Sequence, residues 1–276
     1  MQLPVADGGE GTLDVLYRAL GGGWHLADVH DAFDRPRRAR WLELPDGTAA
    51  VEAAEAIPLD PSTLDPLHAS SRGLGELVLA VGRPRALLVG LGGTANVDGG
   101  AGLREVVGEL PAPTRVACDA LVPLLDAARL FAAQKGADGA EIGQLVARLA
   151  AMEELRPVAD LPGAGAAGGL GAALAALGAE LVPGAAHVLD AIGFEPRGFD
   201  LVVTGEGTVD RTTARGKAPG EVARRCAAAG VRCVVFGGRV VEALPVAETV
   251  ALSGDPSRAH DDLVALGEEL VAALRR

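Results

Sequence analysis

Short apolar runs that do not alternate with polar residues are the feature that most restricts the fold of this chain. They occur at residues 85–91 (RALLVGL), 200–204 (DLVVT), 232–236 (RCVVF) and 248–254 (ETVALSG). A strand without alternation is buried on both faces, as in a parallel sheet that helices cover on both sides. Apolar side chains spaced three and four apart predict helices over residues 220–231 and 261–276. We therefore predict an α/β fold that ends in a βαβ series.

Residues 24–55 follow a different pattern, in which short strand-like segments are separated by the turn-forming sequences DRP and PDG. Closely spaced strands with such turns predict a small antiparallel meander. Residues 70–82 then predict a helix that leads into the strand at 85–91. A chain of 276 residues can form one large α/β domain or two smaller ones.

Charge and cysteine content exclude some classes of partner and compartment. The chain has 25 Lys and Arg residues against 37 Asp and Glu, and this net charge of −12 argues against nucleic acid or an anionic membrane as the main partner. The cysteines, Cys118, Cys226 and Cys233, form no Cys-x-x-Cys pair, and no apolar leader follows Met1. These features predict a reduced, cytoplasmic protein with structural thiols.

Residues 161–179 carry no charge and allow three interpretations. A membrane-spanning helix is disfavoured, because Pro162 and six glycines make the segment weakly hydrophobic. Residues 163–168 match the letters G-x-G-x-x-G, with Asp190 about 20 residues later, as in dinucleotide-binding oxidoreductases. Pro162 interrupts the strand that should precede that motif, so we favour a closely packed helix.

Ligands of open α/β sheets bind outside the carboxyl ends of the strands, so the polar residues that follow each strand are candidates for a site. The first such loop, residues 7–12 (DGGEGT), follows a predicted strand at 3–6. Its glycines allow backbone N–H groups to approach an anion, and its two acids can hold a divalent cation. The alternative is a capped turn at a helix start.

The second loop follows the predicted strand at 85–91. It contains Gly92, Gly93 and Thr94, and then Asp98 within the sequence DGG. Clustered glycines can form an anion-binding nest, and Asp98 can bind a metal or act as a base. The alternative is a glycine-rich turn with an N-capping aspartate. Asp119 and the turn around Lys135 are secondary candidates.

The third loop is predicted to begin at Thr204, where the apolar run at 200–204 ends. Glu206 and Asp210 lie four residues apart, several threonines surround them, and Lys217 follows. Phosphoryl transfer requires this combination of carboxylates for Mg²⁺, cations for the transferred group and backbone amides around phosphates. Surface ion pairing explains the charges but not the sequence Gly-Glu-Gly after a buried strand.

Other catalytic signatures are absent from the sequence. The five histidines lie far apart and form no His-x-x-x-His or His/Cys cluster, so neither a zinc site nor a Ser-His-Asp hydrolase site is supported. Gly216 and Lys217 lack the upstream glycine of a Walker A loop, and Ala218 follows them. Any nucleotide therefore requires a different phosphate-binding loop.

Taken in order along the chain, these segments resemble the bacterial glycerate kinase family. The resemblance runs through residues 5–12 (VADGGEGT), 70–77 (SSRGLGEL), 90–103 (GLGGTANVDGGAGL), 117–119 (ACD), 134–138 (QKGAD), 161–174 (LPGAGAAGGLGAAL) and 200–219 (DLVVTGEGTVD with GKAP). It implies transfer of the ATP γ-phosphate to a hydroxyl of D-glycerate with Mg²⁺, in a cleft between two domains. The implied Rossmann-like domain is discontinuous, residues 1–23 and 187–276, and the second α/β domain, residues 24–186, contains the meander.

The residues that match the family's motifs receive roles by our own inference from their chemistry. We assign catalysis to Asp98, Glu206 and Asp210, metal binding to Asp7 and Glu10, and substrate or nucleotide binding to Gly8, Gly9, Gly92, Gly93, Thr94, Lys135, Thr204, Gly205 and Lys217. The expected partner is a small hydroxy acid, and a homodimer is left open.

The sequence also departs from the family's pattern. Family members usually begin with a further strand and a loop reading Asp-Ser-Phe-Lys-Gly-Ser, whereas Met1 here is followed almost at once by the second strand. Leu121 and Val122 replace a polar pair of the family, and Thr208 stands where a basic residue is common. Two functions therefore remain: an active kinase, or a catalytically impaired homologue that binds a small acid or a protein.

Overall fold

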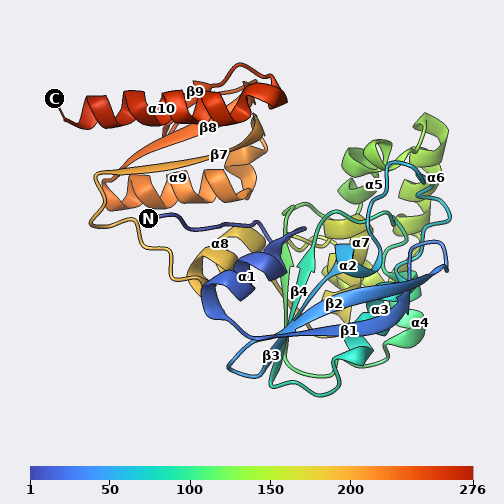
Figure 1. Ribbon diagram of the computed structural model, residues 1–276. Helices are drawn as coiled ribbons and strands as arrows, with labels where there is room; N and C mark the ends of the chain where they lie inside the picture. Colours follow the sequence, from blue (N-terminus) through green and yellow to red (C-terminus); the bar gives the residue numbers. More distant parts are fainter. Residues whose placement is uncertain (276) are drawn as a thin grey trace. The chain divides into compact units, whose positions relative to one another are not determined.

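The computed structural model describes residues 1–275, apart from the side chain of Arg215. The chain forms two compact units, Met1–Gly193 and Phe194–Arg276, here called the N-terminal and C-terminal units (Figure 1). Each unit has its own sheet. The fold is α/β, as predicted, whereas the division into residues 1–23 with 187–276 and residues 24–186 stays a prediction.

The N-terminal unit contains a six-stranded sheet in the order β1-β2-β3-β4-β5-β6. The strands are β1 (Gly23–His30), β2 (Pro36–Glu43), β3 (Thr48–Glu52), β4 (Ala86–Leu91), β5 (Thr114–Cys118) and β6 (Glu180–Pro183). The first three pair antiparallel, which confirms the predicted meander, and β3 to β6 pair parallel. The carboxyl ends of four neighbouring strands therefore share one edge.

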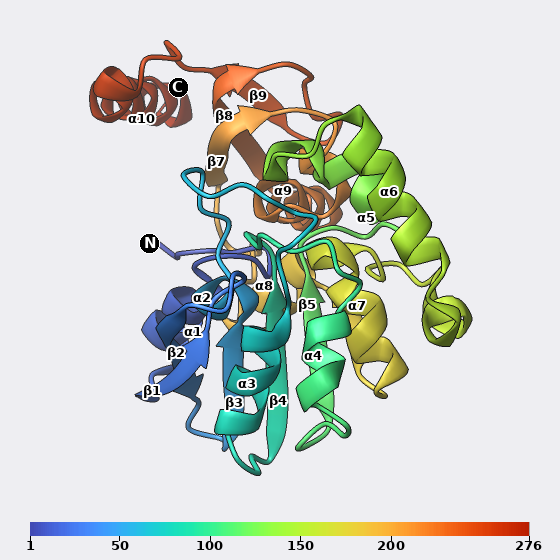
Figure 2. The ribbon, with the colours of Figure 1, turned by 90° about the vertical axis from the view of Figure 1, so that its right-hand side faces the viewer.

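Helices cover both faces of this sheet, because successive residues of a strand point to opposite sides. The helices are α1 (Thr12–Leu20), α2 (Ala53–Ala56), α3 (Arg72–Ala80), α4 (Ala101–Val106), α5 (Asp126–Phe131), α6 (Gly139–Ala150), α7 (Ala166–Ala176) and α8 (Gly184–Ala191). Helices α3, α4 and α7 cover one face (Figure 2). Val51, Val89 and Val116 pack in the same cluster as buried leucines of these helices. Leu88 and Ala117 face the opposite side, where α1 packs. The burial of both faces explains why these strands lack alternation.

A separate apolar cluster joins α5, α6 and the start of α7. It also includes the 3₁₀-helix η2 (Glu153–Val158), and Leu124, Leu145, Leu149 and Leu155 are its large buried side chains. Asp138 caps α6 by accepting hydrogen bonds from the N–H groups of Ala140 and Glu141. This cluster holds a second 3₁₀-helix, η1 (Ala133–Lys135), at the margin of the candidate site.

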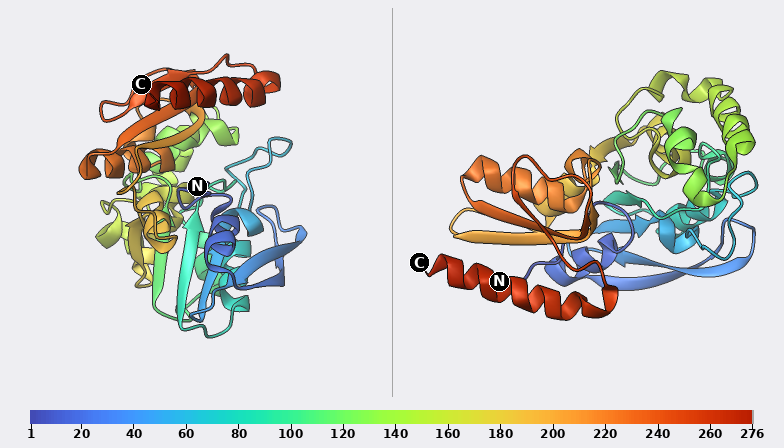
Figure 3. Two further views of the ribbon diagram at one scale, coloured as in Figure 1. Left: turned by 60° about the vertical axis from the view of Figure 1, so that its left-hand side comes forward. Right: turned by 90° about the horizontal axis from the view of Figure 1, so that it is seen from above.

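The C-terminal unit is a three-stranded parallel sheet in the order β7-β8-β9, which confirms the predicted βαβ series. Its elements are β7 (Leu201–Val209), η3 (Thr213–Arg215), α9 (Ala218–Ala229), β8 (Arg232–Val240), β9 (Glu248–Ala251), η4 (Pro256–Arg258) and α10 (Ala259–Leu274). Helices α9 and α10 cover opposite faces of this sheet (Figure 3). Val234 packs with Leu266 and Leu270 of α10.

Two sequence predictions about strands are wrong. Residues 3–6 form no strand in the described part of the chain, because neither sheet offers them a partner. Strand β7 does not end at Thr204 but pairs with β8 as far as Val209. A Cβ atom on Gly205 would lie 2.4 Å from the carbonyl oxygen of Phe236, so this glycine permits close strand packing rather than beginning a loop.

The glycine-rich segment that contains α7 packs closely, as predicted, but it is not one regular helix. Ala167, Gly168 and Gly169 have positive φ angles of 49°, 69° and 95°, which interrupt the helix. A Cβ atom on Gly168 would lie 2.1 Å from the carbonyl oxygen of Asn96. Among the described residues, no helix is both long and apolar enough to cross a bilayer. The three cysteines are free and buried.

Two leucines on α3 test how the core stabilises the N-terminal unit. Leu77 is fully buried, whereas Leu79 is 48% exposed on the same helix. We expect Leu77→Ala to lower the free energy of unfolding by about 2–5 kcal/mol through lost burial and a cavity. Leu79→Ala should change it by less than about 0.5 kcal/mol. Urea unfolding followed by fluorescence reports this unit, because both tryptophans, Trp24 and Trp41, lie in it. Equal effects would contradict this core assignment.

Candidate functional site

The loop of residues 7–12 lies directly against the carboxyl ends of β4 and β5, because the contacts between them are backbone to backbone. Gly8 has φ of +94°, and a Cβ atom there would lie 2.8 Å from the carbonyl oxygen of Ala117. A Cβ atom on Gly92 would lie 2.7 Å from Cα of Gly9 and 2.9 Å from Oδ2 of Asp119. Side chains at Gly8 or Gly92 would therefore separate the loop from the sheet.

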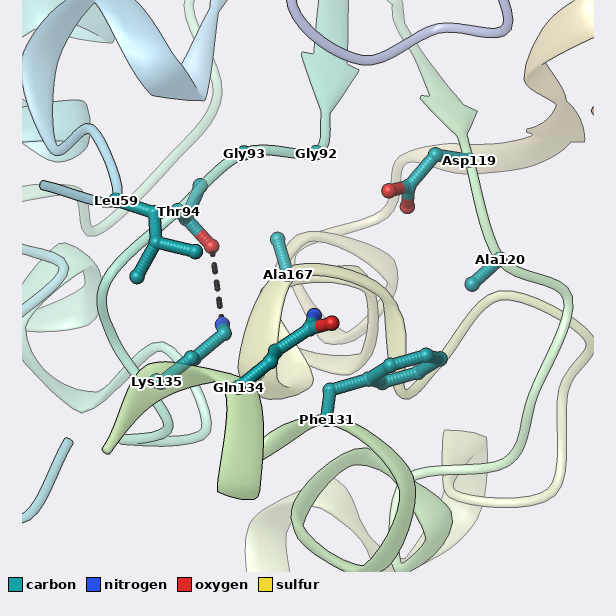
Figure 4. A pocket seen from close by; sticks show the side chains of 11 residues that line it. Leu59, Gly92, Gly93, Thr94, Asp119, Ala120, Phe131, Gln134, Lys135 and Ala167 are labelled. Atoms are coloured by element: carbon teal, nitrogen blue, oxygen red, sulfur yellow. Dashed lines mark hydrogen bonds between the residues drawn. The ribbon is translucent and has the colours of Figure 1, made fainter. Parts of the chain in front are cut away.

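A small cavity of about 80 Å³ opens at this edge of the sheet (Figure 4). Its lining comes from the ends of β4 and β5, from η1 and from the break in α7, and consists of Leu59, Gly92, Gly93, Thr94, Asp119, Ala120, Phe131, Gln134, Lys135, Ala167 and Gly168. Lys135 and Gln134 lie on one side of the cavity and Asp119 on the other. The cavity therefore has an ammonium and an amide opposite a carboxylate.

Lys135 is the most deeply buried charged group at the cavity, with only 4% of its surface exposed. Its Nζ donates to the backbone carbonyl of Asn96 at 2.7 Å and to Oγ1 of Thr94 at 3.4 Å. Burial lowers the pKa of Lys135 to about 8, and the charges of Asp119 and Asp98 partly oppose that shift. The ammonium therefore predominates at neutral pH, and it fixes the loop after β4.

Asp119 follows β5 directly and points into the cavity (Figure 4). Its pKa is raised to about 7, chiefly by burial and also by the charge of Asp7, and the charge of Lys135 opposes both effects. The backbone N–H groups of Asp119 itself and of Ala120 also favour the carboxylate. A carboxylate has about four lone-pair positions, so this group retains capacity to accept a hydrogen bond from a ligand.

Asp98 is surrounded quite differently, although it was predicted to be catalytic. Its carboxylate is 7% exposed and accepts hydrogen bonds from Ser71 N, Ser71 Oγ, Asn96 Nδ2, Gly100 N and Gly102 N at 2.7–3.1 Å. These donors use its accepting positions and join the loop after β4 to the starts of α3 and α4. The geometry gives Asp98 an anchoring role, and a catalytic role stays a prediction.

The predicted metal ligands, Asp7 and Glu10, extend from one loop toward the glycines around the cavity. Asp7 Oδ1 accepts a hydrogen bond from Gly9 N at 3.2 Å, and Glu10 Oε2 lies 3.5 Å from where a Cβ atom on Gly93 would be. Among the described residues, no group of three or more His, Cys, Asp or Glu side chains could hold a metal. Mg²⁺ commonly takes one or two carboxylates, with water and phosphate as its other ligands, and two carboxylates on this loop fit that pattern.

Glu52, which was not identified from the sequence, fixes the loop of residues 7–12 by hydrogen bonds to its end. It ends β3, is 3% exposed, and accepts hydrogen bonds from Leu13 N at 2.6 Å and Gly11 N at 3.3 Å. Burial raises its pKa to about 7, while these two N–H groups oppose the shift. Its position at the end of a short strand was the only sequence signal that could have indicated it.

The C-terminal unit holds a second group of predicted site residues. Glu206, on β7, accepts hydrogen bonds from Thr213 Oγ1 at 2.5 Å and from Lys217 Nζ at 3.1 Å. The side chain of Lys217 is 36% exposed and that of Glu206 is 18% exposed. Lys217 immediately precedes α9 as its N-cap residue, and its ammonium is held by Glu206. Glu206 therefore orients Lys217 while leaving part of the ammonium accessible.

Asp210 serves the turn after β7. Its carboxylate accepts from Thr212 N at 2.7 Å and from Thr212 Oγ1 at 2.5 Å, and these hydrogen bonds lower its pKa. Thr204 and Gly205 lie within β7 rather than in a loop. Their predicted binding roles, and the catalytic role of Asp210, stay predictions.

The structure thus brings together the first two predicted loops in the N-terminal unit, with Lys135. The lining of the cavity also includes the secondary candidates, Asp119 and the turn around Lys135 with Gln134, and adds Phe131. Asp119 was only a secondary candidate because residues 114–118 were not recognised as a strand. Had they been, the rule that applied to the other loops would have selected it.

Three comparisons relate the chain to known proteins. The model of the glycerate kinase family matches residues 1–112 and 110–254. Glycerate 2-kinase of Escherichia coli (strain K12) is 37% identical over 269 residues, which cover 79% of this chain and 71% of that protein. Glycerate kinase of Halalkalibacterium halodurans is 34% identical over 286 residues, which cover 86% and 75%.

A solved structure is also similar. The crystal structure of a Salmonella typhimurium LT2 protein, assigned as glycerate kinase 2, has a TM-score of 0.76 and 30% sequence identity. The match covers 100% of this chain and 88% of that chain.

The anchoring role of Asp98 predicts a stability effect. In Asp98→Asn, one oxygen becomes an NH₂ group that faces backbone N–H donors, so buried hydrogen bonds are lost. We expect the free energy of unfolding to fall by about 2–4 kcal/mol, measured by urea unfolding with tryptophan fluorescence. The control Asp126→Asn, on the exposed start of α5, should change it by less than about 0.5 kcal/mol. A loss below about 1 kcal/mol for Asp98→Asn would contradict the anchoring role.

Glu52 predicts a pH effect on stability. Its folded-state pKa of about 7 lies above its ordinary value of 4.5, so the folded protein binds more protons between these values. The Glu52 contribution to stability is therefore present below pH 4.5 and is lost as pH rises to 7. Relative to wild type, the free energy of unfolding of Glu52→Gln should rise by up to about 3 kcal/mol as the pH increases across this range. Urea unfolding at a series of pH values measures that difference, and parallel curves would contradict it.

Proposed function

Because the chain belongs to the glycerate kinase family, we propose that it transfers the γ-phosphate of ATP to a hydroxyl of D-glycerate. One observation carries the proposal: a buried ammonium and a carboxylate face each other across a small cavity at the carboxyl edge of a parallel sheet. A hydroxy acid offers a carboxylate to the first and a hydroxyl to the second. The cytoplasmic location and the homodimer stay predictions.

Phosphate binding is assigned to backbone amides and cations. Gly92 and Gly93 line the cavity without side chains, so a phosphate can approach their backbone closely. Gly8 and Gly9 lie against this edge of the sheet, and we assign them to binding through the position of their loop. Lys217 supplies a partly exposed ammonium held by Glu206, which suits it to neutralise charge on a phosphoryl group. Catalysis of this kind depends on positioning and electrostatic stabilisation.

The family also implies Mg²⁺. Asp7 and Glu10 are the residues that would hold it, together with oxygens of the nucleotide phosphates. When bound, Mg²⁺ neutralises charge that develops on the transferred group and on the leaving group. The chain's own residues would orient the acceptor acid, exclude water and hold the phosphates.

A coupled assay tests the proposal. We expect ADP release from ATP and Mg²⁺ that depends on D-glycerate, and product assays with enolase, with and without phosphoglycerate mutase, identify the phosphorylated hydroxyl. Glu206→Gln weakens the charge pair that orients Lys217, so kcat/KM for ATP should fall by about 10–100-fold. Lys217→Met, which removes the ammonium, should lower kcat/KM for ATP by at least as much.

Glu248→Gln is the matched control in the same unit, because Glu248 pairs with Arg232 at 2.8 Å on an exposed surface. It should leave turnover unchanged. Wild-type protein that is folded and binds D-glycerate but releases no ADP would refute the kinase and favour the small-acid-binding homologue. Wild-type turnover that survives Lys217→Met would refute the role of Lys217 alone.

A further inference from the structure

We propose that the cavity of the N-terminal unit is the acceptor pocket, in which Lys135 and Gln134 bind the carboxylate of the acid and Asp119 accepts the proton of the reacting hydroxyl. This proposal rests on the proposed kinase function and goes further, by assigning an orientation to the acceptor and a catalytic role to Asp119. Three properties of the cavity carry it: its size, its charge distribution and the free accepting capacity of Asp119.

The size of the cavity separates the two kinds of substrate. Pockets for drug-sized ligands occupy about 300–1,000 Å³, whereas this cavity has about 80 Å³. Its small size suits a three-carbon acid better than a whole nucleotide. The walls that set this limit are Leu59, Phe131 and the carboxyl ends of β4 and β5.

The charge distribution favours a hydroxy acid over a phosphate group. A phosphate that filled the cavity would present charged oxygens to the Asp119 carboxylate, which needs a hydrogen-bond donor as its partner. A hydroxy acid places its anionic end at Lys135 and Gln134 and its neutral, hydrogen-bond-donating end at Asp119 (Figure 4). The ammonium of Lys135 has three N–H donors and uses two of them within the protein, on Asn96 and Thr94, so one remains for the ligand.

Asp119 is suited to the proton transfer because its carboxylate is not saturated. The donors that favour its charged form are two backbone N–H groups. Asp98, by contrast, accepts five hydrogen bonds and has no accepting position left. Of these two acids, only Asp119 lines the cavity.

The proposed transfer forms one bond at phosphorus and breaks one there. The O–H bond of the acceptor hydroxyl breaks, and its proton moves to the Asp119 carboxylate. The hydroxyl oxygen forms a bond to the γ-phosphorus of ATP, and the bond from that phosphorus to the β,γ-bridging oxygen breaks, so ADP leaves with the electron pair. The proton on Asp119 then passes to solvent, which accounts for the one proton that the reaction releases.

Binding and turnover of three variants test the proposal. Calorimetry would measure the affinities of wild type, Asp119→Asn, Gln134→Leu and the control Asp126→Asn for D-glycerate, for propanoate, which lacks hydroxyls, and for ATP. We expect Asp119→Asn to lower the affinity for D-glycerate by at least about tenfold and to leave the affinity for propanoate within about twofold of wild type. Its kcat should fall by about 10²–10⁴-fold. Gln134→Leu should lower the affinity for both acids, and Asp126→Asn should leave both affinities unchanged.

The results distinguish this proposal from the function on which it rests. Asp119→Asn would overturn the assignment of Asp119 if it lowered the affinities for D-glycerate and propanoate equally, or lowered the affinity for ATP instead. That conclusion would hold even if wild type is an active kinase. Absence of wild-type turnover would refute the kinase and, with it, the proton transfer to Asp119. The binding comparison needs no ATP, so it would still decide whether the cavity is the acid-binding pocket. Gln134 is exposed, so Gln134→Leu tests the carboxylate end without threatening the fold.

Discussion

The candidate site depends on backbone contact between glycines at the carboxyl edge of the N-terminal sheet. Gly9 lies against Gly92, Gly8 lies against the end of β5, and a Cβ atom on Gly184 would lie 2.0 Å from the carbonyl oxygen of Asp7. Such contacts leave no room for side chains, so the acids beside these glycines, Asp7 and Asp119, are brought close to the same small cavity. Packing at this edge thus decides which charged groups meet.

That arrangement requires a buried cation. Two carboxylates in a partly buried site destabilise each other, and the charge of Asp7 does raise the pKa of Asp119. Lys135 compensates for this repulsion, at the expense of its own desolvation, and its hydrogen bonds to Asn96 and Thr94 hold the loop after β4. The same ammonium therefore stabilises the loop and gives the cavity its polarity.

Much of the fold follows from the sequence, because apolar runs without alternation and the turns of the meander are local signals. The predictions that failed concern contacts between residues that lie far apart in the sequence. Gly205 resembles the start of a loop, but it is needed for packing against Phe236 on the neighbouring strand. Residues 114–118 form β5 although Arg115 makes them look only half buried, and with that strand unrecognised Asp119 was ranked below the other acids. Glu52 could not be identified, because its partners, Gly11 and Leu13, are brought to it only by the tertiary fold.

Asp98 and Asp119 show why residue type alone does not assign a role at such a site. Both are aspartates that come after neighbouring parallel strands, and both influence Lys135. Asp98 accepts five hydrogen bonds, which join α3, α4 and the loop after β4. Fewer donors surround Asp119, and the cavity lies in front of it. A ligand can therefore complete the hydrogen bonding of Asp119 but not that of Asp98, and this difference arises from the surrounding backbone.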